Sequence, residues 1–503
     1  MQAVAESRPP HRSAIDTAIK VLWFALLVSI PFTSHPLTAE LIRWSPVSPL
    51  AVLPLIGLAL LWLPQYLSRT RSVPKLSIPL LAFVLVVIVA SLVAQFLPIY
   101  PAFNQTVFGR ELRSMLTLGA GVAVYLVAST WPGSSSRLKI SLRWLYIGGI
   151  LLLLYSSFQI ATLPGIDDPV PEPLIRLHRF FTVRDPLRAR ITGFAYEPSW
   201  LGNQLVTLYI PLWLGAVISG YSAFSRRSGW ISLEMLLALW ALVILFFSFA
   251  RLAWISLFLI VGVLLIAGSG RVAERVAERF GFNERSRKDT QRVLPRIVIL
   301  AIGTLGLLVV IAAVVFAASI LDERVARILE TDLSNVFSGR DPWPYLLANA
   351  LRSGERLMYW TSGLRVFSTY PVIGVGLGNT GFLMTETMPA FGYRLPEIIQ
   401  AVHLGEFGFP NPKSLWVRLL AETGIVGFTL FVTWLILLGV AAARLVRTHK
   451  GLARAIGLAA LLALLAQITE GFSLDTFGLP HLWVMLGLLT AASQVYSARG
   501  RSA

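Results

Sequence analysis

The recurrence of apolar runs of about 20 residues along the whole chain constrains its fold more than any other feature. A helix of that length crosses the hydrocarbon core of a bilayer and satisfies its own backbone hydrogen bonds there. Because the chain is 55% hydrophobic and only 14% charged, it lacks the polar surface of a large soluble enzyme. We therefore expect an all-α polytopic membrane protein with about 12 transmembrane helices. The runs lie at 17–34, 48–66, 77–97, 114–131, 142–162, 199–219, 230–248, 252–268, 297–319, 424–443, 453–470 and 479–496.

The basic residues are distributed unevenly between the connections of these helices. If the N-terminus is cytoplasmic, the outer connections between helices contain few basic residues: the connection 35–47 has only Arg43, and the connection 471–478 has no Lys or Arg. This asymmetry is the positive-inside pattern, which predicts cytoplasmic termini and accounts for the net charge of +17 without a nucleic-acid partner. The first run ends without a small-residue cleavage pattern, so we expect it to be retained as an anchor. The cytoplasmic basic clusters fall at 8–20, 69–75, 137–143, 226–227, 271–296, 444–454 and 499–501.

Two outward-facing segments break this pattern. By the same count, residues 163–198 and 321–422 lie outside although both are rich in arginine, and Arg251 lies at the outer end of a helix pair. Outward basic residues oppose the insertion bias, so we expect an anionic ligand at the outer interface. The predicted organisation is helices 1–9 (1–320), a large helical periplasmic loop that forms the active-site wall (321–422) and helices 10–12 (423–503).

The stretch that follows Ser353 has the signature of a helix start. Ser353 is the expected N-cap of a helix that stops before Pro371. Arg356 then lies in the first turn, where a cation is unfavourable beside the helix dipole. An anion bound by Arg356 and by free backbone N–H groups would remove the conflict. An ion pair with Glu355 or Asp341 is the alternative, and the local sequence leaves both open.

Two further stretches have both a structural and a functional interpretation. Residues 370–379, Y-P-V-I-G-V-G-L-G-N, place three glycines at alternate positions, which favours tight packing over ligand contact. In R-I-T-G-F-A-Y-E-P-S-W (190–200), Glu197 precedes a helix and would stabilise its dipole. Alternatively, Glu197 accepts a hydrogen bond from a sugar hydroxyl or orients the arginines. His403, in the large loop, is either a base or a solvated side chain.

Several short motifs in this part of the chain occur together in one known family. Three elements of a bacterial membrane family resemble motifs of this chain in their order and placement. The motifs are S-F-A-R-L-A-W (248–254), E-R-L-M-Y-W (355–360) with the glycine-rich stretch after it, and L-L-A-E-T-G-I-V-G (419–427). That family is the O-antigen polymerase and O-antigen ligase family of multi-span glycosyltransferases, of GT-C type.

The chain departs from the family pattern at one place. Ligase-like members have a His-Asn pair where this chain has Lys413 and Ser414, so the usual catalytic histidine does not carry over. The Glu-Pro-Ser form at 197–199 is more similar to polymerases.

The resemblance implies metal-independent glycosyl transfer, without a cofactor, at the outer face of the bacterial inner membrane. The donor would be a glycan on a polyprenyl (undecaprenyl) diphosphate, and the acceptor a sugar hydroxyl of another lipid-linked repeat unit. Arginine forks suit a diphosphate leaving group because they neutralise its charge bidentately. The residues expected to be catalytic are Arg251, Arg356, Glu197 and Lys413; those expected to contact substrate are Arg190, Arg352, His403, Asn411, Tyr359 and Trp360.

Two alternatives stay open. One is a ligase that moves finished glycan onto lipid A core. The other is a transporter of the same lipid-linked sugars, although such proteins usually carry ionisable residues at mid-membrane and paired broken helices. A chain-length regulator protein is an open partner in the polymerase case.

Overall fold

A computed structural model of the chain describes residues 10–43, 47–70, 72–162, 168–224, 227–228, 231–279, 289–330, 342–351, 353–403 and 408–499. These residues are mostly helical, and the short strands β1 (Arg227–Ser228) and β2 (Ile231–Ser232) form an antiparallel pair. The long helices are α1 (Pro10–Ser29), α3 (Val52–Thr70), α4 (Ile78–Ala94), α5 (Val107–Thr130), α6 (Ser135–Ala161), α10 (Leu233–Ser248), α11 (Arg251–Arg279), α12 (Asp289–Leu321), α16 (Gly354–Thr369), α19 (Leu415–Thr448), α20 (Gly451–Glu470) and α21 (Pro480–Arg499).

Shorter helical elements connect them. The α-helices are α2 (Pro36–Ile42), α7 (Glu172–Phe181), α8 (Pro198–Gln204), α9 (Ile210–Ser219), α13 (Glu323–Leu329), α15 (Trp343–Ala350), α17 (Met384–Thr387) and α18 (Pro396–Ile398). The 3₁₀ turns are η1 (Lys75–Ser77), η4 (Thr380–Leu383) and η5 (Ala390–Arg394), and the π-helical turns are η2 (Leu205–Tyr209) and η6 (Ile399–His403).

The all-α fold predicted from the apolar runs is confirmed, because every predicted run coincides with a helix of the structure. The run 199–219 corresponds to α8, η2 and α9 in direct succession. Within the described part of the chain, nine helical stretches are long and apolar enough to cross a bilayer, and α10 is a shorter apolar helix. The count of about 12 spans therefore stays a prediction.

Local sequence signals explain where several of these helices begin. Thr106, Ser134, Ser232 and Ser414 each precede a helix, and the side-chain oxygen of each accepts a hydrogen bond from the backbone N–H three residues later. Such N-caps satisfy one of the free donors of the first turn. Hydroxyl residues thus mark where α5, α6, α10 and α19 begin.

The helix formed by α8, η2 and α9 contains a π-helical turn just before a proline. Pro211 has no N–H to donate, so the backbone ahead of it cannot keep regular α-helical hydrogen bonding. Beyond the turn, α9 packs very closely on α20. A Cβ on Gly215 would lie only 2.6 Å from the carbonyl oxygen of Ala455, so a glycine is needed at this contact.

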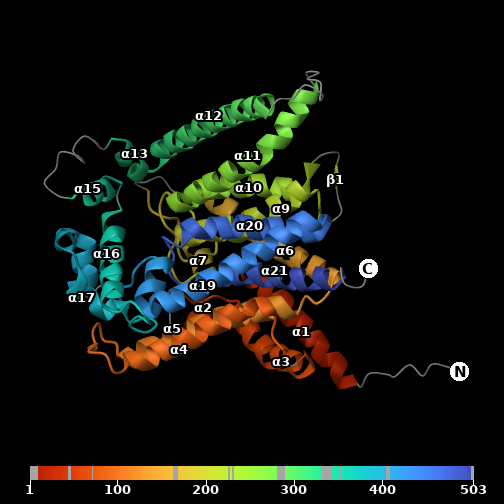
Figure 1. Ribbon diagram of the computed structural model, residues 1–503. Helices are drawn as coiled ribbons and strands as arrows, with labels where there is room; N and C mark the ends of the chain where they lie inside the picture. Colours follow the sequence, from red (N-terminus) through yellow and green to blue (C-terminus); the bar gives the residue numbers. More distant parts are fainter. Residues whose placement is uncertain are drawn as a thin grey trace.

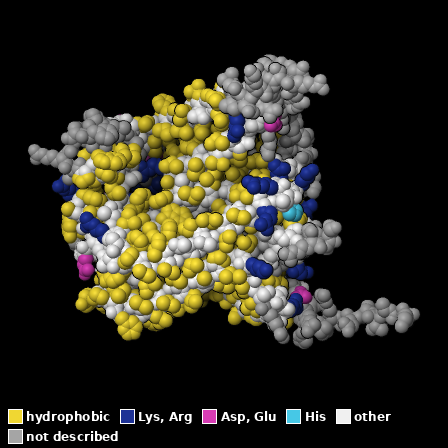
Figure 2. All heavy atoms as spheres, viewed as in Figure 1, with side chains coloured by type: hydrophobic (Ala, Val, Ile, Leu, Met, Phe, Trp, Pro, Cys, Tyr) yellow, Lys and Arg dark blue, Asp and Glu magenta, His cyan; other side chains and the backbone are white. Residues whose placement is uncertain are grey.

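Figure 1 shows the long helices packed side by side, with α13, α15, α16 and α17 gathered at one end of the bundle. The first turn of α1 and the last turn of α21 lie at the opposite end. In Figure 2, apolar side chains cover the middle of the molecule, and Lys and Arg gather mainly at the end where α1 begins and α21 finishes. This distribution fits a protein whose middle is surrounded by lipid.

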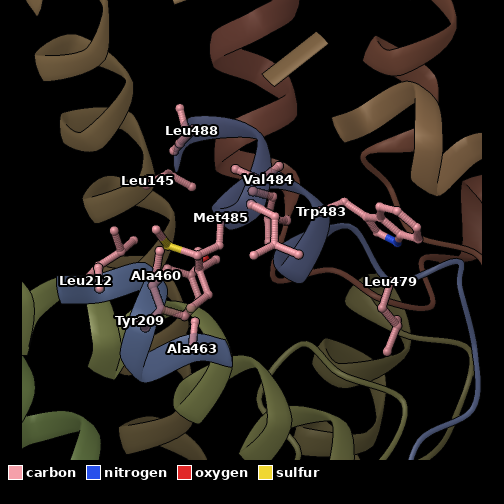
Figure 3. Close-up of a cluster of buried hydrophobic side chains, with 14 of the residues drawn as sticks. Leu145, Tyr209, Leu212, Ala460, Ala463, Leu479, Trp483, Val484, Met485 and Leu488 are labelled. Carbon is pink, nitrogen blue, oxygen red and sulfur yellow. The ribbon is translucent and has the colours of Figure 1, made fainter. Parts of the chain in front are cut away.

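The core lies where α6, η2, α9, α20 and α21 meet (Figure 3). Met485 of α21 packs there with Tyr209 and Ala460, and all three side chains are fully buried. Small residues on α20 let the bulky side chains of its neighbours approach its backbone. The core therefore fixes α20 and α21, and the loop that connects these two helices belongs to the candidate site described next.

Candidate functional site

Arg251 opens α11 immediately after a tight turn. Phe249 ends α10 in the left-handed conformation, with φ of 48°, and the hydroxyl of Ser248 accepts a hydrogen bond from the backbone N–H of Ala250 at 3.3 Å. This turn leaves Arg251 exposed at the end of the helix pair. Its Nη1 donates to the carbonyl oxygen of Leu351 at 2.9 Å. Arg251 thereby contacts the segment that leads into α16.

Arg356 lies in the first turn of α16, as predicted. The helix begins at Gly354 after Ser353 and ends before Pro371. The hydroxyl of Ser353 does not cap the helix but donates to the Leu351 carbonyl at 3.3 Å. Arg356 is half-buried, and its Nη1 donates to the carbonyl oxygen of Phe472 at 3.3 Å. The contact of Arg251 with Leu351 thus brings Arg251 close to the start of the helix that carries Arg356.

The electrostatic surroundings of Arg356 are shaped by carboxylates from separate elements. Burial lowers the pKa of the Arg356 guanidinium, and the nearby carboxylates oppose that effect. They belong to Glu197, Glu470, Asp475 and Glu397. The guanidinium reaches a backbone carbonyl rather than Glu355, one of the two partners that the sequence left open. The other, Asp341, lies outside the described residues.

Lys413 lies beside α16, next to Tyr359. The side-chain oxygen of Asn411 accepts a hydrogen bond from the Lys413 backbone N–H at 3.1 Å, and Lys413 adopts a φ of 53°. This turn directs the exposed Lys413 side chain to Tyr359, with Nζ 5.7 Å from the ring centroid. Tyr359 follows Arg356 by three residues, so both project from neighbouring positions of one helix face. Asn411, Lys413, Tyr359 and Arg356 are therefore brought together.

The connection between α20 and α21 holds these elements in place. The carbonyl oxygen of Gly471 accepts hydrogen bonds from the Leu415 backbone N–H at 2.7 Å and from the Ser414 hydroxyl at 3.1 Å. The next residue, Phe472, accepts the bond from Arg356 and packs its ring 5.5 Å from that of Trp360. The start of α16 and the start of α19 are thus attached to one short loop.

Glu197 is the N-cap residue of α8, although its side chain makes no capping bond. It forms an ion pair with Arg184, with 3.0 Å between Nη1 and Oε1, and accepts a hydrogen bond from the Ser199 hydroxyl at 3.2 Å. Glu197 therefore pairs with an arginine that was not among the predicted site residues. Its carboxylate also acts on Arg356 through space.

Arg190 lies next to the turn that carries Arg251. The backbone N–H of the following residue, Ile191, donates to the carbonyl oxygen of Phe247 at 3.4 Å, close to the end of α10. Gln159 of α6 holds the same segment, since its Oε1 accepts two backbone N–H groups of residues 192–193, at 3.2 and 2.8 Å. The segment that begins with Arg190 is therefore fixed against α6 and α10.

His178 supports this segment from α7. Tyr155 and Gln159 both contact its Nδ1, at 2.9 and 3.1 Å. Burial lowers the pKa of His178 to about 4, so the imidazole is neutral at pH 7. A buried neutral imidazole with polar partners has a structural role here.

The glycine-rich loop after α16 serves packing, the interpretation that the sequence favoured. Gly374, Gly376 and Gly378 all have positive φ, from 72° to 92°. A Cβ at these positions would overlap the backbone of α19 or side chains of α5. The backbone N–H of Gly376 donates to the carbonyl oxygen of Glu422 at 3.0 Å. The loop therefore attaches the end of α16 to α19.

Two predicted site residues cannot be placed. Arg352 lies outside the described residues. His403 is the last residue of η6, but its side chain lies outside the described part of the structure.

Sequence reasoning missed Glu397, which precedes His403 in the same loop. Glu397 keeps an exposed surface, yet the surrounding protein excludes enough water to raise the pKa of its carboxyl, and Glu355 adds to this effect. Lys413 and Arg356 act in the opposite direction, so both cations are near. The only signal in the sequence was a carboxylate in the same outward loop as Arg356, which does not single out one position.

A family model described as O-antigen ligase (Wzy_C) matches residues 236–432. The matched region runs from α10 into α19 and includes Arg251, Arg356, Glu397 and Lys413. No curated protein matches the chain in a sequence comparison. The resemblance drawn from the sequence motifs is confirmed over residues 236–432, the part of this multi-pass membrane protein that matches the O-antigen ligase family model.

Proposed function

We propose that the protein polymerises lipid-linked oligosaccharide repeat units at the outer face of the inner membrane. The observation that carries the proposal is that Arg251 donates to the carbonyl oxygen of Leu351, close in the chain to Arg356, at one end of the bundle. Two arginines at this end of the bundle suit a diphosphate at the membrane surface, because guanidinium forks bind phosphate oxygens bidentately. A glycan carried on a polyprenyl diphosphate supplies that group.

In the proposed reaction, an acceptor sugar hydroxyl attacks the anomeric carbon of the donor glycan. The bond between that carbon and the diphosphate oxygen breaks, and its electron pair leaves with the diphosphate. Arg251 and Arg356 stabilise the charge that develops on the leaving group. Arg190 and Lys413 add positive charge from the neighbouring turns, and Arg352 precedes Arg356 in the same segment.

The acceptor hydroxyl must lose its proton in this step. Glu397 is our candidate for the base, because its carboxylate is accessible and lies near Arg356 and Lys413. Trp360 is partly exposed and offers an aromatic face to a sugar ring, whereas Tyr359 is buried and does not. Asn411 and Glu197 offer hydrogen-bonding groups for sugar hydroxyls. In this assignment Lys413 supplies positive charge and is not the base.

A ligase that transfers finished glycan to lipid A core is the second candidate, and the O-antigen ligase description of the matching family favours it. Lys413 and Ser414, where ligase-like members have a His-Asn pair, favour the polymerase. Ser414 is also occupied as the N-cap of α19 and as a donor to the Gly471 carbonyl.

Reconstitution separates the two candidates. The full-length protein is placed in vesicles that contain lipid-linked repeat units as the only glycan. A polymerase produces a ladder of longer lipid-linked products. A ligase leaves the units unchanged until lipid A core is added, and then transfers them to it. Absence of any transfer under both conditions would contradict the proposed function.

A further inference from the structure

We propose that Glu470 is a positioning residue for Arg356, held for this task by a buried hydrogen-bond network that joins α8, α11, α20 and α21. This inference rests on the proposed function, because it assigns to Glu470 the orientation of a diphosphate-binding arginine. Glu470 is the last residue of α20 and only 2% exposed.

Both carboxylate oxygens of Glu470 accept hydrogen bonds from side chains of other helices. The hydroxyl of Ser256 on α11 donates to Oε1 at 2.9 Å. The amide nitrogen of Asn203 on α8 donates to Oε2 at 2.9 Å. All three side chains are buried. Buried charges persist in proteins when hydrogen bonds and an opposite charge compensate their desolvation.

His481 of α21 completes the network. Because Asn203 donates its amide N–H to Glu470, its side-chain oxygen is left as an acceptor, and the Nε2 of His481 lies at hydrogen-bond distance from that oxygen. This orientation assigns the imidazole proton to Nε2. Four helices therefore fix the Glu470 carboxylate in one orientation.

The position of Glu470 in its helix calls for a cation close by. The C-terminus of an α-helix carries partial negative charge, so a carboxylate at the end of α20 is unfavourable for the helix by itself. Arg356 supplies the positive charge, since each of the two groups acts electrostatically on the other. The guanidinium also donates to the carbonyl of Phe472, two residues after Glu470. Arg356 is thus held by the end of α20 through charge and through a directed hydrogen bond.

The test measures binding of geranylgeranyl diphosphate, a short polyprenyl diphosphate, to the detergent-purified full-length protein. Glu470→Gln keeps the shape of the side chain and removes its charge, and we expect it to weaken binding by about tenfold. Glu234→Gln is the matched control. Glu234 is also a fully buried carboxylate of a long helix, but it accepts a hydrogen bond from the Ala223 backbone N–H near the start of α10. We expect it to change binding by less than about twofold.

A double-mutant cycle separates positioning from a general structural effect. If Glu470 acts through Arg356, then Glu470→Gln has no further effect on affinity in an Arg356→Ala background. If the two losses multiply instead, the inference is wrong. Should Glu470→Gln fail to fold, Ser256→Ala removes one donor and keeps the carboxylate, with an expected loss of about threefold that also disappears in the Arg356→Ala background.

The outcomes also distinguish this inference from the function on which it rests. If Arg356→Ala weakens binding and Glu470→Gln does not, the diphosphate site stands and the role of Glu470 is refuted. If the wild-type protein does not bind the probe, or if Arg356→Ala leaves its affinity unchanged, the proposed function fails and the role of Glu470 fails with it.

Discussion

The positive charges of Lys413 and Arg356 both act on the carboxylate of Glu397. A base must be ionised to accept a proton, so activity falls as the pH drops through the pKa of Glu397. That pKa is raised above the ordinary value of a glutamate by desolvation and by Glu355. The acid limb of the pH–rate profile should therefore lie at a higher pH than for a solvated glutamate.

We predict that Glu397→Gln lowers kcat by about a hundredfold and removes this acid limb, since a positioned base contributes at least that much. The measurement is the rate of chain extension at a series of pH values, with vesicle-reconstituted protein. Glu386→Gln is a suitable control, because Glu386 is an exposed carboxylate of α17 in the same loop. An unchanged acid limb in Glu397→Gln would show that another group is the base.

Lys413 offers a second test at the level of single residues. Its positive charge lowers the pKa of Glu397. Lys413→Ala should therefore retain activity at neutral pH and shift the acid limb to higher pH, whereas Lys413→Arg should leave the limb in place. Complete loss of activity in Lys413→Ala at every pH, in a protein that still inserts, would make Lys413 itself essential.

Among the elements, α19 joins the membrane bundle to the candidate site by a break in its helix. Gly424 has φ of 62° and ψ of −169°, a conformation open essentially to glycine alone. The break lets the backbone N–H of Ile425 donate to the Pro371 carbonyl at 2.8 Å. A Cβ on Gly424 would lie 2.2 Å from the carbonyl oxygen of Val372. The end of α16 therefore depends on this glycine for its contact with α19.

We predict that Gly424→Ala destabilises the protein by about 3 kcal/mol, from backbone strain and steric overlap together. The midpoint of thermal unfolding in detergent measures the effect. Gly306→Ala on α12 is the control, because a Cβ there meets nothing within 4 Å and should change stability by less than ~1 kcal/mol. Equal midpoints for the two variants would refute the need for glycine at Gly424.

The sequence predicted the helices better than their ends and their buried polar contacts. Hydropathy placed the span at 424–443, but α19 begins at Leu415, because Arg418 and Glu422 form a buried ion pair with 2.8 Å between Nε and Oε2. A hydropathy window ends the predicted span at such charged residues, although two opposite charges one turn apart can pair inside the helix. Local rules predicted where α16 begins and where it ends. They also predicted the packing role of the glycines in the loop that follows it.

The candidate site was predictable only in part. Arg251 and Arg356 were predicted as site residues because basic residues on the outer side run against the positive-inside pattern. Glu397 and Glu470 were missed because their importance depends on contacts between residues far apart in the chain, such as Asn203 with Glu470. No periodicity or spacing in a single sequence reports such contacts.

For the molecule as a whole, the proposed function requires the site to face away from the cytoplasm. The chain has no native cysteine, so single introduced cysteines can report topology without background labelling. We predict that a membrane-impermeant maleimide labels Thr385→Cys, in the loop near the site, in intact cells whose outer membrane admits it. Lys450→Cys, between α19 and α20, should react only after the inner membrane is permeabilised. Both positions are exposed. Labelling of Lys450→Cys in intact cells, with Thr385→Cys protected until the inner membrane is permeabilised, would contradict the proposed orientation.

The outer surface of the bundle is consistent with contact to lipid chains. α12 packs mainly along α11 and exposes apolar side chains such as Ile302, Leu305 and Val309. Large apolar surfaces of this kind are unfavourable in water and favourable in hydrocarbon. A membrane-embedded bundle therefore carries the candidate site at one end.

The most direct test of the central claim is chain extension by Arg251→Ala and Arg356→Ala proteins, reconstituted in vesicles at wild-type levels with lipid-linked repeat units. The account predicts that each alanine variant extends chains at least about a hundredfold more slowly, because it loses a donor to the leaving diphosphate. The lysine variants should retain part of the activity, since a point charge lacks the guanidinium fork. Wild-type product ladders from both alanine variants would contradict the claim that these arginines bind the diphosphate.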